Sequence, residues 1–123
     1  MDIAARTGAI FAAFEANDAE GVAALCAPGC RVKQNNEPEV DLDTLVAGLR
    51  SMLWDGGVTT AYSDVRRTVA EGVVTEQHLV TLTRPDGVQA SCDVCVVVRF
   101  DDDGLITRVD EYLDMAAFAP LFS

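Results

Sequence analysis

The chain has 123 residues, half of them hydrophobic, and a formal net charge of −11. A chain of this length forms a single domain with one core, here residues 1–123, and its hydrophobic content argues against disorder. The negative charge repels nucleic-acid phosphates and anionic lipid surfaces, so neither partner is expected. There is no apolar run near the roughly 20 residues that span a bilayer and no secretory signal pattern, so we expect a cytoplasmic protein.

Three helices are predicted in the first half of the chain. The first spans residues 2–16, and the second is short, begins at Asn17-Asp18 and ends at Pro28-Gly29. A strand at 30–34 and a polar loop at 35–39 follow. The third helix begins at Asp41 or Asp43 and stops at Gly56-Gly57. Apolar residues spaced by three and four form its stripe: Leu42, Leu45, Val46, Leu49, Met52 and Leu53.

From Val58 onward the hydrophobic period changes to two, which predicts strands at 59–71, 73–83, 88–100 and 105–113. The breaks between them contain Gly72, Gly87 and Gly104, each in a good hairpin turn. Consecutive strands joined by tight turns form an antiparallel meander, and a short apolar helical segment ends the chain. Helices followed by a sheet that they cover define an α+β domain.

Metal and cofactor signals are weak. Cys92 and Cys95 have zinc-knuckle spacing, but three residues apart on a strand their sulfurs point to opposite faces. Cys26 and Cys30 flank Pro28-Gly29, and four thiolates around zinc remain the alternative to buried, reduced side chains. We expect no metal, and because no phosphate loop or dinucleotide fingerprint is present, no cofactor.

Glu111 is the main candidate for chemistry. It alternates with Val109 and Leu113 on one apolar face of the last strand. Burial there would raise the pKa of its carboxyl, which suits a general acid or base near neutral pH. The alternative is a structural carboxylate that pairs with an arginine or accepts backbone hydrogen bonds.

The order of elements, with two sequence phrases, resembles the nuclear transport factor 2-like superfamily. The phrases are 17–27, at the second helix, and 104–114, at the last strand. Within it, the chain is most similar to SnoaL-like polyketide cyclases and limonene-epoxide-hydrolase-like proteins. The resemblance implies a cone of three N-terminal helices on a curved antiparallel sheet. It also implies a pocket for a small hydrophobic ligand and a homodimer formed through the outer sheet face.

The resemblance also suggests site residues. The acid of the last strand falls on Glu111, and the base or water-holding position of the first strand falls on Gln34. The arginine and aspartate of the epoxide hydrolases fall on Gln77 and Leu79, and their tyrosine falls on Val32, so most of that water-activating set is replaced. We expect Gln34 and Gln77 to hydrogen-bond a ligand, although both could be ordinary polar residues near strand ends. Apolar contacts would come from Leu79, Val32, Val109 and Leu113.

Four further side chains have open roles. The same register turns His78, the only histidine, away from the pocket, whereas a shift of one residue would turn it inward toward Glu111 as a possible acid/base partner. Trp54 either walls the pocket mouth or anchors the end of the third helix. Tyr62 and Tyr112 are alternatives for a hydroxyl donor, because the sequence does not fix the strand face on which either lies.

Three functions are compatible with this sequence. The first is an enzyme of the isomerase, cyclase or hydrolase type, in which Glu111 moves a proton on a carbonyl-bearing, polyketide- or terpenoid-like molecule. The second is a module that binds such a molecule without chemistry, and the third is a structural dimerisation domain.

Overall fold

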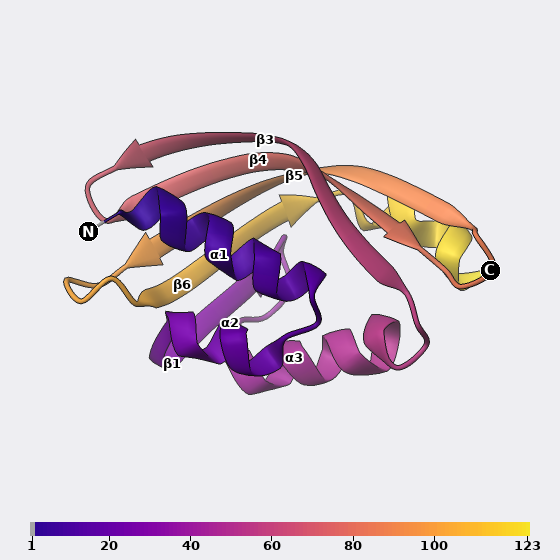
Figure 1. Ribbon diagram of the computed structural model, residues 1–123, viewed down its shortest axis with the longest axis horizontal. Coiled ribbons are helices and arrows are strands. Elements are labelled where there is room, and N and C mark those ends of the chain that lie inside the picture. The colour runs from indigo at the N-terminus through magenta and orange to yellow at the C-terminus, as the bar shows by residue number, and fades with distance from the viewer. Residues whose placement is uncertain (1) are drawn as a thin grey trace.

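The computed structural model describes residues 2–123 and shows an α+β domain in which helices cover one face of a curved sheet (Figure 1). Residues 2–123 contain five helical segments and six strands, in the predicted order except that the third helix ends in a separate π-turn and one short strand is added. In chain order they are α1 (Ile3–Glu15), α2 (Ala19–Leu25), β1 (Cys26–Gln34), β2 (Val40–Asp41), α3 (Leu42–Leu49), η1 (Arg50–Trp54), β3 (Thr59–Ala70), β4 (Val73–Thr83), β5 (Gln89–Phe100), β6 (Ile106–Leu113) and η2 (Met115–Phe122).

An aspartate caps the N-terminus of each α-helix. The side chains of Asp2, Asp18 and Asp41 accept hydrogen bonds from backbone N–H groups of the first turns of α1, α2 and α3. These bonds satisfy donors that a helix leaves without partners, so the three starts are locally encoded. At its other end α3 passes into the π-turn η1, in which the Asp55 N–H donates to the Arg50 carbonyl at 2.8 Å.

The sheet has the order β2-β1-β6-β5-β4-β3. The meander of β3, β4, β5 and β6 is antiparallel throughout, as predicted. The sheet as a whole is mixed, however, because β1 runs parallel to β6. β1 and β6 are far apart in the sequence, so no tight turn forces them to be antiparallel. The turn signals of the sequence therefore do not show the direction of this pair.

The segment around Pro28-Gly29 differs from the prediction. These residues do not end the second helix, which stops at Leu25, but lie inside β1. The register between β1 and β6 shifts between Cys26 and Arg31, so the two residues occupy an irregularity of the strand. Proline lacks the N–H that a regular ladder needs, and Gly29 has a φ of +79°, so both suit such a break.

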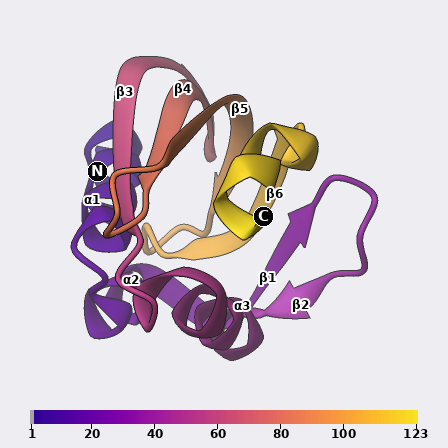
Figure 2. The same ribbon diagram turned by 90° about the vertical axis from the view of Figure 1, so that its right-hand side faces the viewer.

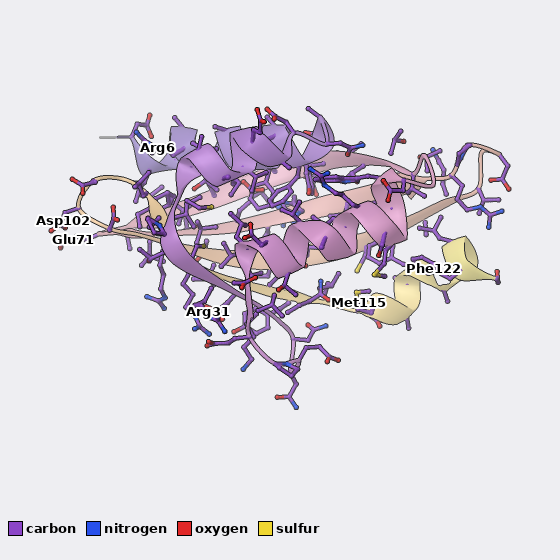
Figure 3. The ribbon with its side chains drawn as sticks, turned by 90° about the horizontal axis from the view of Figure 1, so that it is seen from below. Arg6, Arg31, Glu71, Asp102, Met115 and Phe122 are labelled. Carbon is purple, nitrogen blue, oxygen red and sulfur yellow. The ribbon has the colours of Figure 1, made fainter. Side chains whose placement is uncertain are left out.

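The core lies between the concave sheet face and the helices. Figure 2 looks onto the end of the molecule where η2 lies, and η2 packs there against β5. In Figure 3, Met115 and Phe122 lie on η2 at the same end of the molecule as the last turn of the α3–η1 helix. Among residues 2–123 none of the helices is long and apolar enough to cross a membrane.

Candidate active site

Glu111 lies on the inner face of β6, next to the end of β1. The parallel register places Gln34 beside it, and Gln34 Nε2 donates a hydrogen bond to Glu111 Oε1 at 2.7 Å. On its other side Glu111 is paired with Val96 of β5, which is fully buried. The carboxylate therefore has one oxygen held by an amide and its surroundings are otherwise largely apolar.

Asn35 fixes the backbone around this acid. Its N–H donates to the carbonyl of Glu111 at 2.8 Å. Its side chain donates to the Leu113 carbonyl at 2.8 Å and accepts from the Leu113 N–H at 2.9 Å. Asn35 has a φ of +50°, a conformation that asparagine tolerates better than most residues. The end of β1 is thereby tied to β6 on both sides of the Glu111 side chain.

The protonation of Glu111 is shifted by its surroundings. Burial raises the pKa of its carboxyl above the ordinary value of 4.5, because desolvation disfavours the charged form. The hydrogen bond from Gln34 and the nearby His78 each oppose this shift without cancelling it. A carboxyl with a raised pKa takes up and releases a proton closer to neutral pH than a solvated glutamate.

Tyr62 places a hydroxyl in the same space. It lies on β3 opposite Val80, on the inner face of the sheet. Burial, followed by the negative charge of Glu111, raises the pKa of Tyr62, so the phenol keeps its proton. No protein acceptor for this hydroxyl is found among residues 2–123, which leaves it free to donate to a ligand. The sequence named Tyr62 as a candidate but did not fix the face of β3 on which it lies.

A cavity with two lobes surrounds these groups. The C-terminal lobe, about 280 Å³, reaches Trp54, Phe118 and Phe122. The N-terminal lobe, about 260 Å³, reaches Ile10, Val32 and Pro38. Seven residues line both lobes: Phe14, Gln34, Val40, Leu45, Leu49, Tyr62 and Glu111. We call the three polar members of this set, Gln34, Tyr62 and Glu111, the polar waist.

Six of the site residues expected from the sequence come together on the walls of this cavity. Gln34 and Glu111 line both lobes. The remaining four divide between the two, with Trp54 and Leu113 on the C-terminal lobe and Val32 and Val109 on the N-terminal lobe.

The expected positions of Gln77 and Leu79 are wrong. The inward residues of β4 are the even-numbered ones, from Val74 to Leu82, so Gln77 is exposed and neither residue lines the cavity. Strand side chains alternate between faces, so a register error of one residue exchanges the two sets completely. His78, an even-numbered residue, therefore lies on the inner face of β4, which is the alternative that the sequence analysis left open.

His78 belongs to a buried chain of ionisable groups behind the cavity wall. His78 and Glu76 are both fully buried, and His78 Nδ1 lies 2.5 Å from Glu76 Oε2. The other carboxylate oxygen of Glu76 accepts from Arg67 Nε, also at 2.5 Å. The rings of Phe11 and Tyr62 pack against the imidazole, with centroids at 4.9 Å and 4.7 Å. Among residues 2–123 His78 Nε2 has no hydrogen-bond partner. Neither Glu76 nor Arg67 was singled out from the sequence.

The four cysteines do not gather at one point, although the side chains of Cys26 and Cys30 lie close enough to interact with each other. Cys26, Cys30 and Cys92 are buried and Cys95 is half-buried, all four as free thiols. Within residues 2–123, no group of three or more His, Cys, Asp or Glu side chains is arranged to hold a metal ion.

The curved mixed sheet, its helical cover and the enclosed cavity define an α+β fold of the nuclear transport factor 2-like class. The profile of the SnoaL-like domain family matches residues 8–109, and the chain belongs to this family. No curated protein matches the sequence.

Solved structures share the fold at low sequence identity. A protein of Xanthomonas campestris pv. campestris assigned as a polyketide cyclase is 19% identical with a TM-score of 0.82, over 98% of this chain and 96% of that one. One from Pseudomonas putida KT2440, assigned likewise, is 15% identical with a TM-score of 0.81, over 96% of each chain. An LEH-like epoxide hydrolase of Mycobacterium tuberculosis is 21% identical with a TM-score of 0.76, over 95% of this chain and 86% of that one.

Proposed function

We propose that this protein is an enzyme that transfers protons on a small apolar molecule bearing a carbonyl group, with Glu111 as its acid/base. The observation that carries the proposal is the placement of Glu111: a desolvated carboxylate on a cavity wall, with one oxygen held by Gln34 at 2.7 Å. A carboxyl group with a raised pKa accepts a proton more readily than a solvated glutamate and can return it without leaving the site. The polyketide cyclases and the epoxide hydrolase of the same fold support a small-molecule substrate.

The proposed step begins with a carbon next to the carbonyl. Glu111 takes a proton from this carbon, the C–H electron pair forms a carbon–carbon double bond, and the carbonyl π pair moves onto oxygen. Tyr62 donates its hydroxyl proton in a hydrogen bond to that oxygen, which stabilises the developing negative charge. In an isomerisation the protonated Glu111 then returns the proton to another carbon. In a cyclisation the enolate carbon bonds to a second carbonyl, whose oxygen takes the proton.

Gln34 has a positioning role in this mechanism. An amide cannot accept a proton in the working pH range, but its N–H holds one Glu111 oxygen in place and leaves the other available. An acid that is already oriented loses less freedom when it reacts, which lowers the barrier.

Exchange of carbon-bound hydrogen with solvent tests the proposal without the natural substrate. When the protein is added in D₂O, apolar ketones and β-diketones should incorporate deuterium at the carbon next to the carbonyl. Proton NMR measures this exchange. Glu111→Gln should slow the catalysed exchange by about a hundredfold or more. The rate should also rise with pH through the raised pKa of Glu111. Glu71→Gln is the matched control, since Glu71 is exposed in the turn between β3 and β4 and does not line either lobe. Equal rates for Glu111→Gln and the unaltered protein would refute the mechanism.

A second function, binding without chemistry, is favoured by one observation. Of the three residues at the polar waist, only Glu111 is left to exchange a proton as an acid or base, since Gln34 cannot titrate and the pKa of Tyr62 is raised above its ordinary value. A ketone that binds with the same affinity to the unaltered protein and to Glu111→Gln, with no deuterium uptake in either, would establish this function instead.

A further inference from the structure

The cavity is divided by its polar groups into two apolar halves of similar size. The C-terminal lobe holds about 280 Å³ and the N-terminal lobe about 260 Å³. Glu111, Gln34 and Tyr62 line both, so the polar waist lies between the lobes and not at the end of either. A molecule that fills both lobes therefore presents its middle, not its end, to Glu111.

The lobes beyond the waist contain few polar groups. Thr44 and Thr60 in the C-terminal lobe and Glu37 in the N-terminal lobe are the polar side chains there, and the remaining wall is apolar. Within the described residues 2–123, no lysine or arginine lines either lobe. A carboxylate or phosphate on the ligand would lose its hydration, find no cation and meet the negative charge of Glu111.

From this arrangement we infer that the ligand is an uncharged, elongated molecule whose reacting carbonyl is internal, with an apolar arm on each side. The inference rests on the proposed function for the identity of the group at the waist. It goes further by excluding aldehydes, free acids and phosphate-bearing carriers as the bound species. It also predicts that the residues lining the C-terminal lobe select one arm of the ligand and those lining the N-terminal lobe select the other.

Two ketones of the same composition test the position of the carbonyl. Dibutyl ketone carries it in the middle and heptyl methyl ketone near one end, and nonanoate adds a charge at equal carbon number. Binding is measured by calorimetry, or by the fluorescence of Trp54, which is the only tryptophan and lines the C-terminal lobe. We expect dibutyl ketone to bind at least fivefold more tightly than heptyl methyl ketone, and nonanoate not to bind. Equal affinity of the two ketones, binding of neither, or tight binding of nonanoate would overturn the inference.

Variants that fill one lobe at a time test the two arms. Gly48 lies on the α3 face that lines the C-terminal lobe, and a Cβ placed there meets no atom within 4 Å, so Gly48→Leu has room to reduce that lobe. Val109→Phe reduces the N-terminal lobe from β6. Each variant should weaken the binding of dibutyl ketone about tenfold and that of heptyl methyl ketone less than twofold. The single long arm of heptyl methyl ketone can occupy the lobe that remains open. Ala47→Leu, on the exposed side of α3, is the control for Gly48→Leu.

The outcomes separate this inference from the proposed function. If dibutyl ketone is preferred but Glu111→Gln leaves deuterium exchange unchanged, the two-armed ligand stands and the proton-transfer role fails. If exchange depends on Glu111 while both ketones bind alike, the enzyme stands and the inference is wrong. The ketone comparison uses the unaltered protein, so it decides the question even if a lobe-filling variant does not fold.

Discussion

Asn35 exchanges two hydrogen bonds with the backbone of Leu113, at 2.8 and 2.9 Å, across 78 positions of sequence. This exchange ties the residue that follows β1 to the strand that carries the candidate catalytic acid. Glu111 lies on β6 between Val109 and Leu113, on the same face of the strand, and its side chain lines the cavity. The position of the acid thus depends on a side chain that does not itself contact a ligand.

Asn35→Gly should lower the free energy of unfolding by about 2 kcal/mol, because two hydrogen bonds of about 1 kcal/mol each are lost. Glycine is chosen because it accepts the φ of +50° without strain, so the decrease in the free energy of unfolding measures the loss of the side-chain hydrogen bonds. Urea denaturation measures the change. Asn36→Gly is the control, since Asn36 is exposed in the same turn. A change in Asn35→Gly no larger than in this control would show that the exchange does not stabilise the fold.

Glu111→Gln should make the protein more stable at neutral pH. The pKa of Glu111 is raised in the folded state, so the native protein holds this proton more tightly than the unfolded chain. The free energy of unfolding must then fall as pH rises from about 4.3 through the folded-state pKa, and glutamine removes this loss. Each pKa unit of the shift adds about 1.4 kcal/mol to the gain. Urea denaturation between about pH 4 and about pH 8 tests it; a difference between the two proteins that does not change with pH would contradict it.

Tyr62→Phe should reduce the turnover of a ketone by up to about a hundredfold while leaving its affinity within a fewfold. A hydroxyl that bonds an oxyanion more strongly than the ground-state carbonyl contributes to the rate and little to binding. The deuterium-exchange assay gives both parameters when the ketone concentration is varied. Tyr112→Phe serves as the comparison, because Tyr112 is 52% exposed. Equal losses in the two variants would remove Tyr62 from the mechanism.

Arg67→Met should lower the free energy of unfolding by about 2 kcal/mol. It removes the cation that faces the fully buried Glu76, and an unpaired buried charge is costly. We take a value below the usual range for a broken buried pair because the Arg67 side chain is 31% exposed and partly screened by water. Arg66→Met is the neighbouring control, with its side chain 55% exposed and paired only with Asp64. Thermal and urea unfolding should distinguish them; similar stabilities would indicate that His78 alone compensates Glu76.

The sequence predicted elements better than it predicted the faces of strands. Periods of 3.6 and of two located the continuous helix of α3 and η1 and the four long strands to within one or two residues, because these patterns reflect which side is buried. It misassigned Pro28-Gly29, since a strand irregularity and a helix stop use the same residues. The parallel pairing of β1 with β6 depends on a contact between distant segments that no local pattern records.

The face of β4 could have been identified from the chain itself. Val74, Val80 and Leu82 share one parity, whereas Thr75, Gln77 and Thr81 share the other, and the more apolar set is the buried one. Glu76 and His78 belong to the apolar set, which is the signal that they are buried polar residues. Aligning single positions by resemblance instead displaced the strand by one residue. The pairing of Glu76 with Arg67 could not have been found this way, because it depends on the register between β3 and β4.

The π-turn of η1 makes the cavity sensitive to chain length. A hydrogen bond that spans five residues, from Asp55 back to Arg50, contains one residue more than an α-helical turn needs. Deleting one residue within this turn would let the helix continue as a regular α-helix. It would also change the positions of Met52, Leu53 and Trp54, which lie in this turn and line the C-terminal lobe. In most surface connections a gained or lost residue is absorbed cheaply, but here it would reshape the space that receives the ligand.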